Sequence, residues 1–157
     1  MPVSLADFPN LRTHYYQVTS PRTPVYNCIA WAAGDSKKRW WPAPAHGYWW
    51  PPGIALSDSV ASFIAAFETI GYVPCGLEAV EFGFTKVVLY ATNGSVKHAA
   101  RQLPNGLWWS KMGAEEDLVH VLGAVAGPSY GFPVQFLRRP IPEAVPPLDA
   151  GSPQPVA

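Results

Sequence analysis

The chain has 157 residues, and its 11 basic residues balance its 11 acidic residues, so the formal net charge is zero. A chain of this length buries one sizeable core and is too short for two ordinary domains, so we expect a single domain. Because no excess charge attracts phosphate groups or anionic lipids, the composition argues against a nucleic-acid partner. Charged residues make up only 14% of the chain, whereas it holds 18 prolines, 13 glycines and seven tryptophans, which favours a loop-rich globular protein over a helical bundle.

The sequence contains no segment that directs the chain to a membrane. Every uncharged apolar run is interrupted by proline or glycine well before the roughly 18 residues that a membrane span needs. Residues 1–10 include Asp7 and no basic residue ahead of an apolar stretch, so they do not resemble a secretory signal. We therefore expect a cytoplasmic protein without a membrane partner, and secretion by a route that needs no signal stays open.

The cysteine content of the chain is low and unpatterned. Cys28 and Cys75 lie far apart, and neither belongs to a CxxC pair, so they predict neither a disulfide framework nor a zinc site. We expect free thiols, with a single disulfide between them as the alternative. The sequence predicts no metal and no organic cofactor.

The first third of the chain combines loops with one short helix. Residues 1–25 hold four prolines and no sustained periodicity, which predicts an extended lead-in anchored by a few large side chains. In residues 26–34, Asn27 is a suitable helix N-cap and Gly34 a suitable end, which predicts a helix of about two turns. Residues 35–53 are so rich in tryptophan and proline that we expect a long loop there.

The middle of the chain predicts a second helix and then a sheet. Ser57 is a suitable N-cap for a helix whose apolar residues recur at helical spacing until Gly71. The periodicity then becomes that of strands separated by asparagine-glycine turns, which predicts a three-stranded antiparallel meander. We expect its strands at 86–91, 96–103 and 107–112, with turns at Asn93-Gly94 and Pro104-Asn105-Gly106.

The last part of the chain predicts a short helix, a strand and a tail. Residues 115–122 begin with acids and predict a helix, and residues 130–138 predict a closing strand whose Pro133 indicates an edge position. Residues 140–157 are rich in proline and poor in large apolar side chains, so we expect a disordered tail. The expected fold class is α+β, with residues 26–139 as one domain in which the antiparallel meander packs against the cysteine-bearing helix.

Cys28 occupies the first turn of its predicted helix. There, free backbone N–H groups and the positive end of the helix dipole favour a thiolate over a thiol. The neighbouring residues are apolar, so an inert buried cysteine is the competing interpretation. Cys28 is a candidate nucleophile, whereas Cys75 has no comparable context.

His98 has the most suggestive position of the four histidines. If Asn93-Gly94 forms a two-residue turn, Leu89 pairs with His98, which places His98 on the sheet face of Val87 and Leu89. A helix would cover that face. We therefore expect His98 to point toward Cys28, as a thiolate-imidazolium pair requires, and to act as general base and then as general acid.

A third polar group would have to orient the His98 ring. If the second turn of the meander is a three-residue loop, Ser110 shares the His98 face and lies diagonal to it. If that loop has two residues, Lys111 takes the same place and offers no acceptor. His120 and Gln102 are the alternatives for the orienting role.

Two segments of the chain form a recognisable pattern: Asn-Cys-Ile-Ala-Trp-Ala, which contains Cys28, and His-Ala-Ala-Arg-Gln-Leu-Pro-Asn-Gly-Leu-Trp-Trp-Ser, which runs from His98 to Ser110. Together they resemble the papain-like amidase and peptidase superfamily, especially its NlpC-like branch. In that branch a nucleophilic cysteine opens a helix, a histidine begins a strand, and a polar residue follows one hairpin later. The resemblance implies a papain-like core and a catalytic site of Cys28, His98 and Ser110, although the family usually has His or Asn where this chain has serine.

A second resemblance covers residues 25–138. This segment is similar to an uncharacterised bacterial domain family whose members share Asn-Cys-Ile, His-Ala-Ala-Arg-Gln-Leu and Ser-Lys-(Leu/Met)-Gly. It is the closer of the two resemblances, and it implies no known activity.

The predicted loop at 35–53 concentrates large rings and basic side chains. The rings are Trp40, Trp41, Tyr48, Trp49 and Trp50, and the basic residues are Lys37, Lys38 and Arg39. Some of these rings must fill the core of a small domain. In the functional interpretation, Trp41 and Trp49 form a groove wall beside Cys28 that stacks on a peptide or sugar, while the basic residues meet an anionic group. Stacking on single-stranded nucleic acid would use similar rings, but the neutral charge balance disfavours it.

The sequence supports three hypotheses about function. In a cysteine hydrolase, Cys28 would attack an amide carbon, His98 would transfer the proton, Ser110 or His120 would orient His98, and Asn27 with nearby backbone N–H groups would hold the oxyanion. In a non-catalytic binding module, the Trp-rich loop would grip a peptide, a glycan or a partner protein. In a thiol-dependent transferase or deamidase toxin, the same thiol would act on a protein side chain. The expected substrate is a peptide, an amide or a glycan-peptide, with a partner protein as the alternative.

Overall fold

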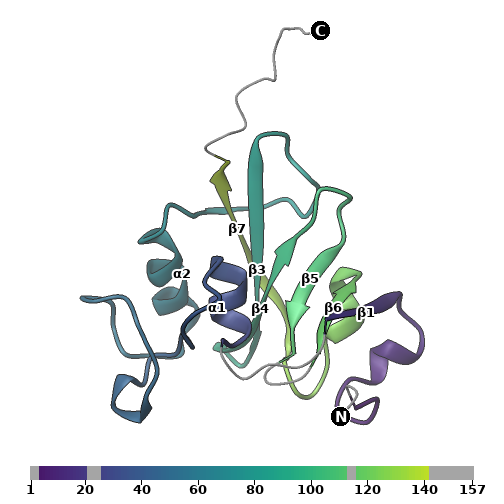
Figure 1. Cartoon of the computed structure of the whole chain (residues 1–157), viewed down its shortest axis with the longest axis horizontal. Helices are drawn as coiled ribbons and strands as arrows, with labels where there is room; N and C mark the ends of the chain where they lie inside the picture. Colours follow the sequence, from purple (N-terminus) through teal and green to yellow (C-terminus); the bar gives the residue numbers. More distant parts are fainter. Residues whose placement is uncertain (1–3, 21–25, 113–115, 142–157) are drawn as a thin grey trace, which may run out of the picture.

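A computed structural model of the chain describes residues 4–20, 26–112 and 116–141 (Figure 1). Within these residues, one antiparallel sheet of seven strands runs in the order β1-β6-β5-β4-β3-β7-β2. The strands are β1 (Tyr16–Ser20), β2 (Val73–Cys75), β3 (Phe84–Thr92), β4 (Ser95–Gln102), β5 (Trp108–Lys111), β6 (Asp117–His120) and β7 (Phe132–Pro140). The helices are α1 (Cys28–Ala33) and α2 (Val60–Glu68), with short 3-10 turns η1 (Pro9–Arg12), η2 (Pro44–His46) and η3 (Leu122–Val125). Helix α1 packs on β4 and β5, which confirms the predicted α+β class.

Both helices begin at polar caps. The Asn27 side-chain oxygen accepts a hydrogen bond from the Ala30 backbone N–H at 3.1 Å, and Gly34 ends α1 with a φ of +87°, as predicted. Helix α2 begins slightly later than predicted, because Ser59 and not Ser57 accepts the capping hydrogen bond.

The predicted meander of β3, β4 and β5 is confirmed. Asn93 and Gly94 have φ values of +51° and +80°, which are the left-handed conformations that a two-residue hairpin turn requires. At the second turn, the Leu103 N–H donates to the Leu107 carbonyl at 2.8 Å, so the loop between them has the three-residue form.

A β-bulge in β4 overturns the predicted register of His98. Ala91 pairs with Val96 as expected, but the next pair is Tyr90 with His98, because Lys97 is an extra residue without a partner on β3. A shift of one residue exchanges the two faces of a strand. The predicted pairing of Leu89 with His98 is therefore wrong, and His98 lies on the face of Tyr90.

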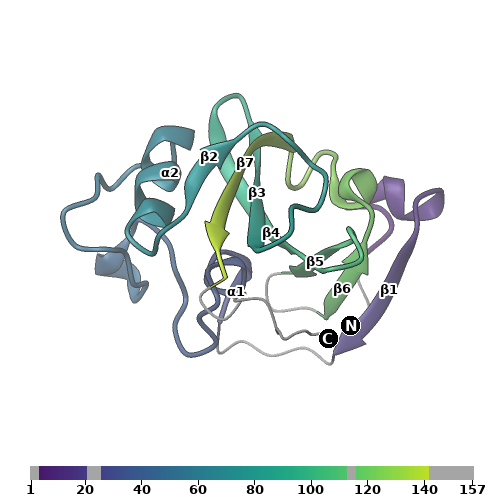
Figure 2. The same cartoon turned by 90° about the horizontal axis from the view of Figure 1, so that it is seen from above.

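The two faces of the sheet carry separate cores, as Figure 2 shows by placing α1 on one side of the sheet and the η3 segment on the other. The α1 face packs Val87, Leu89 and Ala99 against residues of both helices. The opposite face packs Val88, Tyr90 and Ala100 against residues of η1 and η3. The side chains of the candidate catalytic residues each lie on one of these two faces.

The predicted helix at 115–122 is wrong, because Asp117–His120 forms β6. This strand pairs with β5 on one side and with β1 on the other, so its backbone groups are satisfied by neighbours distant in sequence. Strand β1 itself lies within the predicted lead-in at 1–25. The sheet therefore includes part of a segment that the sequence predicts as a loop.

The predicted closing strand is confirmed as β7, but it is not an edge strand. It lies between β3 and β2, and β2 covers only residues 136–138 of it. Pro133 precedes that covered part, so its missing N–H removes no hydrogen bond to β2. The predicted disordered tail lies, from residue 142 onward, outside the described residues. Neither of the helices in the described residues has the length and apolar character to cross a membrane.

Candidate functional site

Cys28 is a packed core residue. It is 8% exposed and belongs to the α1-face core together with Leu89 and Ala99. Burial raises the pKa of its thiol to about 11, and the Ala99 backbone N–H and the charge of Lys111 only partly oppose this rise. At neutral pH the side chain is therefore a thiol, and the expected thiolate is not favoured.

His98, Ser110 and His120 form one hydrogen-bonded chain on the opposite face. The His98 Nε2 lies 2.9 Å from the Ser110 Oγ, which lies 2.7 Å from the His120 Nε2. The His120 Nδ1 must donate, because its partner at 2.7 Å is the Val121 carbonyl. Ser110 therefore donates its proton to His120 Nε2 and accepts from His98 Nε2–H, which fixes the tautomer of both rings.

This histidine-serine chain is sealed from solvent. His98, Ser110 and His120 are each 0% exposed, and the His98 ring stacks on Tyr130 with centroids 4.0 Å apart. The His98 Nδ1 is left as a buried acceptor to which no group in the described part of the chain donates a hydrogen bond. Burial lowers the pKa of His120 to about 4, and burial together with the nearby His120 lowers the pKa of His98 well below its ordinary value.

The predicted site residues are thus brought together only in part. Ser110 lies diagonal to His98 as the three-residue loop predicts, and His120 joins them. Cys28 packs against the other face of the same strand, so the expected Cys28–His98 pair is not assembled. Gln102 donates to the Glu78 carbonyl at 2.7 Å and takes no part in the chain.

Asn27 holds the aromatic loop against α1. Besides capping the helix, its side-chain oxygen accepts from the Trp40 N–H at 2.9 Å, and its Nδ2 donates to the Trp40 carbonyl at 2.7 Å. These bonds occupy the amide that the hydrolase hypothesis assigns to the oxyanion. The observed role of Asn27 is to position the start of the loop.

The rings of the aromatic loop, residues 35–53, divide between core and surface. Trp40 and Trp50 are buried, while Trp41 and Trp49 are half-buried. Trp41 and Trp50 meet the Phe63 ring of α2 edge-on, with ring centres 5.4 and 4.9 Å from that of Phe63. Trp49 packs on Trp40 at 4.7 Å. Trp49 is therefore held by the core on one side and is available to the surface on the other.

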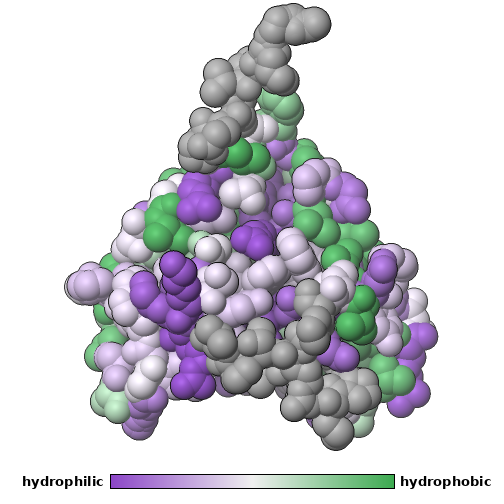
Figure 3. Space-filling view, viewed as in Figure 1, coloured by the Kyte–Doolittle hydropathy of each residue, from purple (hydrophilic) through white to green (hydrophobic). Residues whose placement is uncertain are grey.

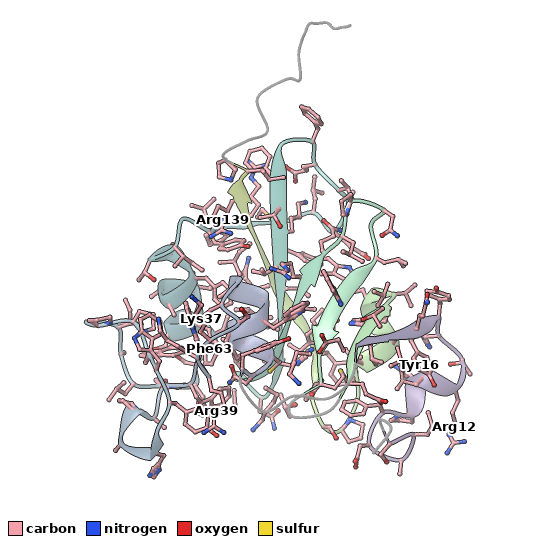
Figure 4. The ribbon with its side chains drawn as sticks, viewed as in Figure 1. Arg12, Tyr16, Lys37, Arg39, Phe63 and Arg139 are labelled. Atoms are coloured by element: carbon pink, nitrogen blue, oxygen red, sulfur yellow. The ribbon has the colours of Figure 1, made fainter. Side chains whose placement is uncertain are left out.

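A surface pocket of about 340 Å³ opens beside Trp49, and we call it the basic pocket. Its lining consists of Lys37, Lys38, Arg39, Gly47, Tyr48 and Trp49. Lys38 Nζ lies 4.4 Å from the centre of the Trp49 ring, and the Arg39 guanidinium lies 5.1 Å from that of Tyr48. In Figure 3, hydrophilic residues gather left of centre, on the part of the molecule where Figure 4 labels Lys37 and Arg39.

Asp35, which is not among the candidate residues predicted from the sequence, shapes this pocket. One carboxylate oxygen accepts from the N–H groups of Lys37 and Lys38, and the other accepts from the Trp40 indole at 2.9 Å. Hydrogen bonds to the carboxylate outweigh its desolvation and lower the pKa of Asp35. An Asp two residues before a basic run is the sequence signal that could have identified this turn. Among the described residues, no group of three potential metal ligands comes together.

We expect iodoacetamide at pH 7 to alkylate Cys75 at least about ten times faster than Cys28, because Cys75 is partly exposed and Cys28 is a buried thiol with a raised pKa. Mass spectrometry of the digested protein over a time course measures both rates. Cys75→Ser leaves Cys28 as the single thiol and serves as the control. Faster labelling of Cys28 would show an activated nucleophile and support the hydrolase hypothesis.

The family model of a domain of unknown function, DUF7689, matches residues 17–138 of the chain. This range includes the Asn-Cys-Ile, His-Ala-Ala-Arg-Gln-Leu and Ser-Lys-Met-Gly motifs. No curated protein and no solved structure matches the chain.

Proposed function

We propose that this chain, which belongs to the DUF7689 family, is a binding module that holds an acidic peptide segment in its basic pocket. The observation that carries the proposal is the lining of that pocket, which combines three basic residues with two aromatic rings and contains no acidic residue. Such a lining favours a ligand that brings carboxylate groups beside apolar or planar surface.

The geometry of the pocket supports charge recognition by prearranged cations. Each ring carries a cation over its face, Lys38 over Trp49 and Arg39 over Tyr48, so the charged ends lose less freedom on binding. Asp35 lies 3.7 Å from Lys38 Nζ and offsets only that one charge. Lys37 and Arg39 are left to supply the attraction for an anionic ligand.

The pocket is also attached to the rigid part of the fold. Asn27 and Asp35 fix the backbone and the indole of Trp40, and Trp40 in turn supports Trp49. A site whose walls are held by the core needs little rearrangement when a ligand binds.

The rival hypothesis is the cysteine hydrolase implied by the resemblance to the papain-like superfamily. It requires an accessible Cys28 and a histidine on the same face of the sheet. Cys28 is buried, and His98 and His120 hydrogen-bond to Ser110 on the other face. The arrangement therefore supports the binding module better than the hydrolase.

We expect the protein to bind a hexaglutamate peptide and to bind hexaglutamine at least about tenfold more weakly, since only the former offers carboxylates. Isothermal titration calorimetry measures both affinities. Arg39→Gln and Lys37→Gln change exposed side chains and should each lower the hexaglutamate affinity several-fold. Added salt should weaken the binding as well, because it screens exposed charges.

The matched control is Lys97→Gln, which removes one exposed positive charge from β4, away from the basic pocket. Its affinity for hexaglutamate should equal that of the wild type. Equal binding of the two peptides, or equal losses in Lys97→Gln and Arg39→Gln, would contradict the proposal.

A further inference from the structure

Arg101 on β4 is an arginine held by rings and not by acids. Its guanidinium carbon lies 4.5 Å from the centre of the Trp31 ring and 5.5 Å from that of Trp109. Among the residues that the structure describes, none accepts a hydrogen bond or forms an ion pair with Arg101, and the side chain is only partly exposed. The two tryptophans thus orient the Arg101 guanidinium, whose five N–H donors have no acceptor among the described residues.

Arg139 lies on β7, which flanks β3 on the side opposite to β4. Its guanidinium lies 4.5 Å from the centre of the Tyr72 ring and donates to the Ile70 carbonyl at 3.0 Å. None of the described carboxylates pairs with it. Figure 4 labels Arg139 well apart from Lys37 and Arg39, so this arginine does not belong to the basic pocket.

The sheet register places both arginines on the α1 face. Arg101 stands directly opposite Val87, and Arg139 stands opposite Thr85, two residues earlier on β3. Val87 belongs to the α1-face core, and alternate residues of a strand share a face. The two cations are close enough that the charge of Arg139 lowers the pKa of Arg101, in addition to the larger effect of burial.

The hydroxyl of Tyr72 is the unpaired polar group beside these arginines. Tyr72 is 1% exposed, and its oxygen is buried without a hydrogen-bond partner among the described residues. Thr85 lies near this oxygen but falls short of hydrogen-bonding geometry. Burial raises the pKa of Tyr72, and the charges of Arg139 and Arg101 oppose this rise. The Arg139 guanidinium lies over the Tyr72 ring, 4.5 Å from its centre.

We propose that Arg101, Arg139 and the Tyr72 hydroxyl form a second binding site, distinct from the basic pocket, that takes a carboxylate group. The two guanidinium groups have no described counter-ion and the buried hydroxyl has no described partner, so all three offer donors from which a carboxylate can accept. An arginine laid flat on tryptophan leaves its edge free, and that edge matches the two oxygens of a carboxylate. The hydroxyl supplies one further donor.

The test is an NMR titration of the full chain with succinate, with succinamide at the same ionic strength as the uncharged analogue. The indole N–H of Trp31, which donates to the Trp109 carbonyl, reports on the site. Succinate should shift this signal and succinamide should not. Arg101→Gln and Arg139→Gln should each weaken succinate binding at least tenfold. Arg101→Lys keeps the charge without the planar fork and should weaken it several-fold.

The Tyr72→Phe variant distinguishes an effect on succinate binding from an effect on folding. Because the hydroxyl bonds no described group, its removal should leave the melting temperature unchanged, yet succinate should bind several-fold more weakly. Arg39→Gln removes a guanidinium from the basic pocket and should not alter the succinate affinity. A response to succinamide, an equal loss in Arg39→Gln, or unaltered binding in Tyr72→Phe would overturn the proposal, and tighter binding of inorganic phosphate would overturn the carboxylate assignment.

Discussion

Acidification from pH 7 to pH 4 is expected to lower the free energy of unfolding by about 3 kcal/mol through His120 alone. Burial holds the pKa of this histidine at about 4 in the folded protein, whereas the unfolded chain has the ordinary value of 6.5. As the pH falls below 6.5, the unfolded state takes up a proton that the folded state excludes. The contribution of His120 to the free energy of unfolding is therefore fully present above pH 7, declines below pH 6.5 and stops declining below about pH 4.

His98 acts in the same direction. Its folded pKa is also lowered, so its contribution to stability is lost over the same range as the pH falls. Protonating His120 at Nε2 also conflicts with the directed chain, because the Ser110 hydroxyl that donates to this nitrogen would then face a second donor and would have to reorient. Protonating His98 at Nδ1 would place a buried N–H where no described group accepts a hydrogen bond. Between pH 5 and pH 7.5 we therefore expect both histidines to take up protons on unfolding and not in the folded state.

Urea unfolding measured at intervals between pH 5 and pH 7.5 tests this expectation. In that range Asp35 and Glu81, whose carboxyl pKa values are lowered, contribute little to the change in the free energy of unfolding, because carboxyl groups change protonation nearer pH 4. The slope should exceed the roughly 1.4 kcal/mol per pH unit that one histidine can supply. The double variant His14→Gln/His46→Gln, which changes two exposed histidines, should keep the slope. A flat profile would mean that the histidine-serine chain titrates in the folded state.

The elements that the sequence predicts correctly depend on local signals. Asn27 and Gly34 delimit α1 because capping and positive φ are properties of single positions, and Asn93-Gly94 forms the hairpin turn for the same reason. The three-residue loop then gives the correct placement of Ser110 diagonal to His98. Each of these predictions needs information from only a few neighbouring residues.

The predictions that fail depend on contacts between distant segments. Nothing in the residues around Lys97 marks the bulge, yet this one extra residue moves His98 from the α1 face to the opposite face. The acids before β6 favour a helix start, but pairing with β1 and β5 overrides that preference. The sequence does not indicate Arg101 as a site residue, because its ring partners come from α1 and β5, which only the fold brings together.

The same bulge changes the functional interpretation. It leaves the α1 face with Cys28 and the opposite face with the histidines, so one sheet separates the nucleophile from the base of the hypothetical hydrolase. Both candidate ligand sites, the basic pocket and the pair of Arg101 and Arg139, then depend on cations and rings. Recognition of anionic groups is the chemistry that the two sites share.

Replacing Lys86 by Met is expected to destabilise the protein by about 3 kcal/mol, since it removes a fully buried ammonium with three good acceptors. Lys86 Nζ donates to the carbonyls of Leu77 and Ala79 at 2.6 and 2.7 Å and forms an ion pair with Glu81 at 2.7 Å. Methionine retains the length of the side chain and its packing. The loss therefore measures the three polar contacts.

These contacts fasten residues 76–83 to the sheet. The loop exposes its own apolar side chains, Leu77 at 62% and Phe82 at 85%, so it has few apolar anchors of its own. Glu81 also pairs with Arg138, which retains part of the attachment when Lys86 is removed. We expect chymotrypsin to cleave after Phe82 faster in Lys86→Met than in the wild type under native conditions.

The control for this prediction is Lys97→Met, which removes an exposed lysine from the neighbouring strand and should change the free energy of unfolding by less than about 0.5 kcal/mol. Urea denaturation of the three proteins at pH 7 gives the comparison. A buried ion pair can cost as much in desolvation as it returns in attraction, and an apolar replacement is then neutral or stabilising. If Lys86→Met were as stable as the wild type and its loop no more sensitive to chymotrypsin, desolvation of the ammonium would cancel its three contacts, and the loop would be held by the backbone and by the Glu81–Arg138 pair instead.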